Sequence, residues 1–283
     1  MTPSKPRAVG IDRRTFLLGT ATAGLVVACG GSDAPETSYS VVQRYPADVF
    51  VPGEVRLPFS LADAAEFITD GPDELGAQIV DLDGNAIGER IAAVRRDITP
   101  APYYAFRTTI DTPGVYGIIV DGGPETGANF QVMERDQVTI PRPGDVLAGF
   151  DTPTVGEPRG VDPICTREPE CPFHSVTLAD ALSVGRHVAY FVGTPAFCQT
   201  GSCTPALETM IGVESEYAED YVFVHAEVWS DLSATVTAPA VDALGLTFEP
   251  ALFITGPDGV IAERLDGLWD ATELRERLDA AMA

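Results

Sequence analysis

From residue 186 to the C-terminus, short apolar runs alternate with segments whose apolar residues recur at helical spacing. In order, the pattern predicts a strand at 187–192, a helix at 205–217, a strand at 221–228, a weak helix at 236–244, strands at 251–255 and 260–264, and a helix at 271–282. The order β-α-β-α-β-β-α predicts an α/β domain in which a crossover-linked parallel pair is followed by a hairpin. A domain of this kind buries its strands between helices.

Residues 38–140 have a different pattern, in which β-like runs alternate with turn signals such as Asp83-Gly84 and Pro113-Gly114. The runs lie at 55–61, 78–82, 103–110, 115–120 and 128–132. No useful helical periodicity occurs here, so we expect an all-β antiparallel sandwich. Residues 103–123 loosely resemble the last strands of bacterial immunoglobulin-like domains, although the cysteine and tryptophan hallmarks are missing. We expect a spacer rather than a ligand-binding module.

The N-terminus carries two export signals in register. Arg13-Arg14 precedes a modest apolar run, and the run ends in a small residue followed by Cys29. The paired arginine resembles a twin-arginine signal, and the run before Cys29 resembles a lipobox. An apolar run of roughly 13 residues is too short to span a bilayer. We therefore expect residues 1–28 to be a signal peptide, Cys29 to be lipidated and residues 29–37 to form a flexible tether.

The charge of the chain excludes one class of partner. Residues 29–283 retain 14 of the 18 basic residues and 41 of the 42 acidic ones, a net charge of −27, with no lysine. Such a surface repels phosphate backbones, so we expect no nucleic acid binding. It also repels anionic lipid headgroups, so the lipid on Cys29 is expected to hold the protein at the membrane.

Four cysteines remain after Cys29, and an even number outside the cytoplasm favours disulfides. Local spacing suggests Cys165 with Cys171 and Cys198 with Cys203, although four cysteines allow three connectivities. The first pair lies in a proline-rich segment with no helix start, so we predict a structural disulfide there. Cys171 and His174 could begin a metal site, but no strong second pair of ligands is visible in the sequence. No metal and no other cofactor is expected.

The second pair carries a family resemblance. Residues 197–205 read FCQTGSCTP and follow the first strand of the α/β pattern, Glu249-Pro250 precedes the third strand, and residues 255–261 read TGPDGVI. Residues 141–283, with their proline-rich leading segment, therefore resemble the thioredoxin-like superfamily of thiol-disulfide oxidoreductases and peroxiredoxins. The resemblance implies a redox-active pair, Cys198 and Cys203, and a cis peptide bond before Pro250 that faces it.

The resemblance has two departures. Thioredoxins place two residues between their cysteines, whereas Cys198 and Cys203 enclose four. Some peroxiredoxins have a four-residue spacing, but Pro250 occupies the region where their arginine would stand. The pattern thus leaves three functions open: thiol-disulfide exchange, peroxide reduction, and a non-enzymatic scaffold in which the pair is a structural disulfide.

The attacking group in thiol-disulfide exchange is a thiolate, so a reactive cysteine needs a lowered pKa. With Thr204 as N-cap and Pro205 as the first helical residue, Cys203 would lie at a helix N-terminus, where the dipole favours an anion. By analogy with the family, Cys198 attacks and Cys203 resolves the mixed disulfide, although the longer spacer could reverse this order.

Two residues of the predicted strand 221–228 are candidate auxiliary groups. Glu227 could be the acid/base that some thioredoxin-like proteins place behind the pair, or a surface carboxylate. His225 could be a copper ligand or a proton carrier, but a hydrogen-bonded structural histidine is the favoured interpretation.

Together these features predict a lipid-anchored, extracytoplasmic thiol-disulfide oxidoreductase with Cys198, Cys203 and Pro250 at its site. Its expected partners are thiols and disulfides of cell-envelope proteins and a redox partner that the sequence does not identify.

Overall fold

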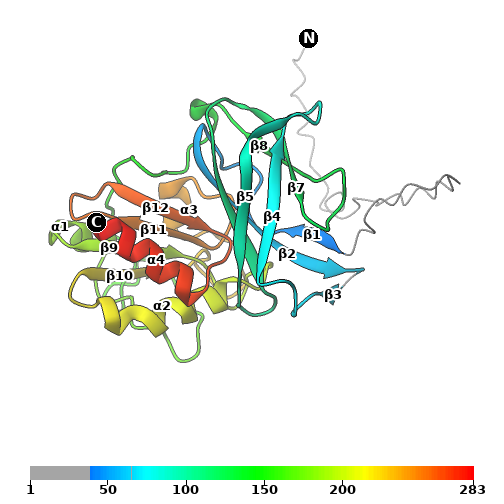
Figure 1. Ribbon diagram of the computed structural model, residues 1–283. Coiled ribbons are helices and arrows are strands. Elements are labelled where there is room, and N and C mark those ends of the chain that lie inside the picture. The colour runs from blue at the N-terminus through cyan, green and yellow to red at the C-terminus, as the bar shows by residue number, and fades with distance from the viewer. Residues whose placement is uncertain (1–38, 65) are drawn as a thin grey trace, which may run out of the picture. The chain divides into compact units, whose positions relative to one another are not determined.

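The computed structural model describes residues 39–64 and 66–283, which belong to one compact unit. The predicted signal peptide, Cys29 and the predicted tether lie outside the described residues, so the expectations about export and lipidation stay predictions. The described residues form two sheets, one of eight strands and one of four (Figure 1). Among the described residues, no helix is long and apolar enough to cross a membrane.

The eight-stranded sheet is built from the first half of the chain, in the order β1-β2-β6-β5-β4-β7-β8, with β3 paired to β2. Its strands are β1 Ser40–Gln43, β2 Gly53–Asp63, β3 Glu66–Phe67, β4 Glu74–Val80, β5 Ala86–Arg96, β6 Tyr103–Ile110, β7 Gly114–Val120 and β8 Ala128–Val132. The pairs that these strands form with one another are antiparallel. The strand β5 pairs along most of its length with β4 and only through Arg95 and Arg96 with β6, so the sheet bends there. This strand-rich, nearly closed arrangement is compatible with the predicted sandwich.

Five of these strands were predicted, and β1, β3 and β5 were not. The missed strand β5 is mostly exposed, with only Ala93 buried along its eleven residues. It therefore lacks the alternation of apolar and polar residues that a half-buried strand shows. In β4, by contrast, Leu75, Ala77 and Ile79 are buried at every second position.

The four-stranded sheet has the order β10-β9-β11-β12. Its strands are β9 His187–Val192, β10 Tyr221–Ala226, β11 Ala251–Thr255 and β12 Ile261–Asp266. β9 and β10 are parallel, whereas β11 is antiparallel to both β9 and β12. The helices are α1 Leu178–Ser183, α2 Cys203–Tyr217, α3 Pro239–Leu244 and α4 Ala271–Met282, with a 3₁₀ turn at Arg135–Gln137. The predicted strands 187–192 and 251–255 and helix 271–282 are confirmed to the residue, and α1 was not predicted.

Helices cover both faces of this sheet (Figure 1). On one face, α2 and α4 pack over Ala189, Phe191, Leu252, Ile254 and Leu265. On the other, buried residues of α1 and α3 share an apolar cluster with Val188, Tyr190, Val192 and Phe253, and this cluster continues into the eight-stranded sheet. A strand with both faces buried reads as a continuous apolar run, which is why β9 and β11 were easy to locate from sequence.

A buried ion pair also joins the two sheets. Arg56 on β2 donates two hydrogen bonds of 2.7 Å to the carboxylate of Glu273 on α4, and the hydroxyl of Tyr103 donates a third. Arg56 also donates to the backbone carbonyls of Asp266 and Leu268. Burial alone would raise the pKa of Glu273, but the charge and hydrogen bonds of Arg56 lower this pKa to about 2. Glu273 is therefore a fully paired anion in an apolar interior.

Candidate active site

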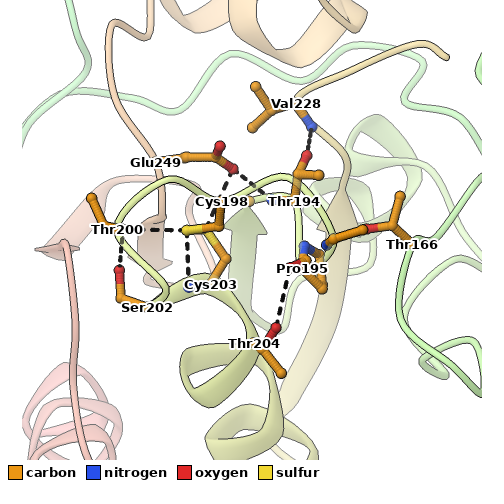
Figure 2. Close-up of a disulfide and its surroundings, with 12 residues drawn as sticks. Thr166, Thr194, Pro195, Cys198, Thr200, Ser202, Cys203, Thr204, Val228 and Glu249 are labelled. Carbon is orange, nitrogen blue, oxygen red and sulfur yellow. Dashed lines mark hydrogen bonds between the residues drawn. A yellow bond between two sulfur atoms is a disulfide. The ribbon is translucent and has the colours of Figure 1, made fainter. Parts of the chain in front are cut away.

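Cys198 and Cys203 lie between the end of β9 and the start of α2, where a disulfide joins them with their Cα atoms 5.9 Å apart (Figure 2). Gly201, between them, has φ +68°, a left-handed conformation that glycine adopts without a steric penalty. The four intervening residues thus form a tight turn that returns the chain to the first sulfur.

The helix α2 begins earlier than predicted. Ser202 is the N-cap and Cys203 is the first helical residue, whereas the sequence pattern placed the cap at Thr204. Pro205 is tolerated because it falls in the first turn, where the backbone N–H has no helical partner. The consequence is that the free N–H of Cys203 donates to Sγ of Cys198 at 3.2 Å.

The two sulfurs differ in accessibility and in partners. Cys198 is partly exposed, and its Sγ lies 3.2 Å from Oγ1 of Thr200, which in turn lies 2.7 Å from Oγ of Ser202 (Figure 2). Cys203 is fully buried. Hydroxyl and amide donors at the positive end of a 15-residue helix stabilise a thiolate on Cys198.

The partner of Cys203 is a carboxyl group that the sequence analysis did not identify. Sγ of Cys203 lies 3.3 Å from Oε2 of Glu249, and the same oxygen accepts the backbone N–H of Thr194 at 2.7 Å (Figure 2). Burial raises the pKa of Glu249 to about 7, a shift that the Thr194 hydrogen bond opposes and the charge of Glu227 reinforces. A carboxyl with a pKa near neutrality can exchange a proton with a thiol at physiological pH.

Glu249 stands immediately before Pro250 in the chain. The Glu249–Pro250 peptide bond is cis, which confirms the prediction from the family resemblance. Pro250 leads directly into β11, which is antiparallel to β9, so Glu249 lies at the end of the sheet where β9 runs into the cysteine loop. The position immediately before the expected cis-proline was the sequence signal that could have identified Glu249.

Glu227, which the sequence singled out as the acid/base, has other partners. Its Oε1 accepts the backbone N–H of Thr166 at 2.6 Å and the hydroxyl of the same residue at 3.0 Å. Glu227 is buried rather than surface-facing. Its hydrogen bonds hold the proline-rich segment, and the carboxyl beside the cysteine pair is Glu249.

Cys165 and Cys171 are both free and buried, where a structural disulfide was predicted. Each sulfur lies near Nδ1 of His225, at 3.9 Å for Cys165 and 3.3 Å for Cys171, and His174 completes the group. The two thiols are unbridged, and the strand residue His225, distant in sequence, lies near both of them, a neighbour that the local spacing of the cysteines did not indicate. The missing second pair of metal ligands is also present: His225 and Cys165 join Cys171 and His174.

No family model matches the chain, and no curated protein matches it. Two solved structures from Chlorobium tepidum, a thiol:disulfide interchange protein of the thioredoxin family and a thiol:disulfide interchange protein DsbE, each cover 50% of this chain. They have 15% and 16% identity, a TM-score of 0.37 each, and 98% and 99% of their own lengths covered. Trypsin-activated alpha-2-macroglobulin from Escherichia coli covers 44% of this chain and 8% of its own, at 21% identity and a TM-score of 0.26. Likeness at these TM-scores does not establish a fold or an activity.

Proposed function

We propose that this protein is a thiol-disulfide oxidoreductase that exchanges electrons through Cys198 and Cys203. The observation that carries the proposal is that the two sulfurs of the disulfide have different environments. Cys198 is accessible and lies at a helix N-terminus, and Cys203 is buried against a carboxyl with a pKa of about 7. A purely structural bridge has no need of either environment.

The fold that surrounds the pair supports the same proposal. A mixed sheet with one parallel and two antiparallel pairs, helices on both faces and a cis-proline leading into the strand beside the cysteine loop is the arrangement of the thioredoxin-like superfamily. We infer that residues 141–283 belong to that fold and that residues 38–140 form an immunoglobulin-like sandwich. Function still rests on the site, because one fold supports many activities.

In the first step, the Cys198 thiolate attacks one sulfur of a substrate disulfide. A bond forms between Sγ of Cys198 and the substrate sulfur that it attacks. The substrate S–S bond breaks, and the other substrate sulfur leaves as a thiolate. The N–H of Cys203 and the hydroxyl of Thr200 stabilise the Cys198 anion before the attack.

In the second step, the Cys203 thiol transfers its proton to the Glu249 carboxylate and attacks Sγ of Cys198. The Cys198–Cys203 bond forms, the mixed disulfide breaks, and the remaining substrate sulfur leaves with the proton that Glu249 returns. The substrate gains two electrons and the pair loses two. The reverse sequence oxidises a substrate dithiol, with Glu249 protonating Cys203 as it leaves.

Export by the twin-arginine signal and lipidation at Cys29 are part of the same proposal. They would place the pair on the extracytoplasmic side of the membrane, among cell-envelope proteins with thiols and disulfides. The absence of lysine from residues 29–283 and their net charge of −27 favour protein partners over nucleic acid.

Trapping of the covalent intermediate tests the proposal. In Cys203→Ser, the mixed disulfide on Cys198 cannot be resolved, so a disulfide-containing peptide should accumulate as an adduct visible by intact mass under non-reducing conditions. Cys198→Ser is the matched control and should form no adduct. Adduct formation only in Cys198→Ser would reverse the order of the cysteines, and adducts in neither variant would contradict thiol-disulfide exchange. Consumption of hydrogen peroxide by the reduced chain, with a sulfenic acid on Cys198, would instead favour a peroxidase.

A further inference from the structure

A second cluster of reactive side chains lies in the interior, apart from the cysteine pair. Cys165, Cys171 and His174 come from the proline-rich segment, and His225 comes from β10. All four residues are buried, and one sulfur or ring-nitrogen atom of each lies within 4.8 Å of the others. Two thiols and two imidazoles that converge in an apolar interior are the ligand set of a closed, tetrahedral zinc site.

The separations between these atoms agree with that geometry. Around a tetrahedral zinc ion, bond lengths of about 2.0 to 2.3 Å place two nitrogens about 3.3 Å apart and a nitrogen and a sulfur about 3.6 Å apart. Here Nε2 of His174 lies 3.0 Å from Nδ1 of His225, and Nδ1 of His225 lies 3.3 Å from Sγ of Cys171 and 3.9 Å from Sγ of Cys165. Each of these three separations is within about 0.3 Å of the tetrahedral value, and the four ligand atoms all lie within 4.8 Å of one another.

The orientation of His225 is fixed from outside the cluster. Its Nε2 lies 2.9 Å from the backbone carbonyl of Gly193, an acceptor that requires the ring proton to be on Nε2. Nδ1 then carries the free electron pair and faces the two sulfurs. A backbone carbonyl that holds the far nitrogen of a histidine in this way is a regular feature of metal-ligating histidines.

Charge and burial agree with a divalent cation. When zinc binds, each of the two thiols loses its proton to solvent, and two thiolates with two neutral imidazoles balance the charge of the ion. The neutral complex would lie among the rings of Phe173, Phe191 and Phe223, where an unpaired charge could not be accommodated.

We propose that Cys165, Cys171, His174 and His225 bind one structural Zn²⁺ ion. The ion would fasten the proline-rich segment to β10. This segment supports the redox loop directly, because Oγ1 of Thr166, next to Cys165, accepts the backbone N–H of Ala196 at 3.1 Å, two residues before Cys198. Gly193, the partner of His225, lies at the end of β9 in the same loop. Metal occupancy would therefore position the loop that carries the accessible sulfur.

The deciding measurement uses the unmodified full-length chain, reduced and freed of metal with a chelator, and titrated with Zn²⁺ and separately with Co²⁺. We expect saturation at about one ion per chain, with the visible bands of tetrahedral Co²⁺ and a thiolate-to-cobalt charge-transfer band in the near ultraviolet. Zn²⁺ should displace the Co²⁺ signal. The spectrum reports ligation without any substitution that could unfold the protein.

Variants then assign the ligands. Cys171→Ser and His174→Gln should lower bound zinc from about one ion per chain to less than about a tenth of that, and Cys171→Ser should weaken the charge-transfer band. The matched control, Cys198→Ser combined with Cys203→Ser, should bind zinc as the unmodified chain does, which separates this site from the redox pair. Peptide mapping that finds a Cys165–Cys171 disulfide in the protein as purified would overturn the proposal. So would the absence of a thiolate-to-cobalt band from the unmodified chain.

Discussion

The Sγ atom of Cys203 lies 3.3 Å from the carboxylate of Glu249, which immediately precedes the cis-proline. Two residues 46 positions apart in the chain therefore place the buried sulfur of the disulfide against a partly buried carboxyl group. Because Cys203 is fully buried, no bulk water is available to take its proton, and the carboxyl is the group positioned to do so.

We predict that Glu249→Gln slows resolution of the mixed disulfide by on the order of 10²-fold near neutral pH, the lower end of the range for a positioned acid/base group. The rate of the unmodified protein should rise as pH increases through about 7, the pKa of Glu249, and this inflection should vanish in the variant. Single-turnover release of a fluorescent thiol from the Cys198 adduct measures the step. Glu216→Gln, an exposed carboxyl at the other end of α2, is the control and should keep the wild-type profile. An unchanged inflection in Glu249→Gln would remove Glu249 from the mechanism.

The same carboxyl should make the stability of the protein pH-dependent in an unusual direction. The folded-state pKa of Glu249, about 7, lies above its ordinary value of 4.5, so folding favours the protonated form. Its contribution to the free energy of unfolding is complete below about pH 4.5 and is lost as pH rises through 7, by on the order of 2 kcal/mol. Urea denaturation of the oxidised protein between pH 5 and 8 should show this fall. A Glu249→Gln variant with the same pH slope would contradict the assignment.

Removing one partner of the buried Arg56–Glu273 ion pair should lower the free energy of unfolding more than replacing both partners. Arg56→Met removes both hydrogen bonds from a cation to the buried Glu273 and leaves it the Tyr103 hydroxyl and Arg107, whose nitrogen lies 3.6 Å away; we expect a loss of about 3 to 5 kcal/mol of unfolding free energy. Replacing both, Arg56→Met with Glu273→Leu, should recover most of the loss. Arg90→Met breaks an exposed pair with Asp121 and should cost no more than about 1 kcal/mol. Equal losses for the two single arginine variants would mean that burial of the Arg56 pair has no energetic consequence.

The stability of the protein at acid pH should also depend on the Arg56–Glu273 pair. The pKa of Glu273 is lowered to about 2 in the folded state, so its contribution is complete above about pH 4.5 and disappears as pH falls toward 2. The difference in stability between the unmodified protein and the Arg56→Met, Glu273→Leu double variant should change over this window and be constant from pH 5 to 7. Chemical denaturation at pH 3, 5 and 7 measures it. A difference that is independent of pH would show that Glu273 titrates normally.

For membrane attachment, we predict that Cys29→Ser moves the protein from the membrane fraction to the soluble one, because two acyl chains on Cys29 would be its anchor. Fractionation of cells, with acyl labelling of the unmodified chain, gives the readout. Arg13→Lys combined with Arg14→Lys should block export instead and leave precursor inside the cell. Recovery of Cys29→Ser in the membrane pellet would show that another segment attaches the chain.

Local patterns in the sequence were sufficient for much of the fold. Both buried strands beside the redox loop and the last helix are read to the residue, because apolar runs and periodic spacing are properties of consecutive residues. Only part of the candidate site could be predicted from such local patterns. Cys198, Cys203 and Pro250 stand in recognisable local contexts, whereas Glu249 meets Cys203 only when β11 pairs with β9.

The same limit applies to the cluster at His225. Cys165 and His225 are 60 residues apart, and nothing in the spacing of either indicates the other. Their meeting depends on how the proline-rich segment crosses β10, where the carbonyl of Phe173 accepts the backbone N–H of His225. A segment without periodicity has no pattern from which its path could be inferred, so the prediction defaulted to the nearest cysteine as a partner.

The Arg56–Glu273 pair also constrains how such a protein can evolve. Arg56 belongs to one half of the chain and Glu273 to the other, and both are buried. A recombination event that joined this C-terminal half to a different β-domain would leave Glu273 buried without Arg56, unless the new domain supplied a cation at the same place. A lone substitution at either position meets the same barrier, so the two sites should change together or be replaced jointly by apolar residues across a lineage. We therefore expect the two halves to be inherited as a matched set rather than as interchangeable modules.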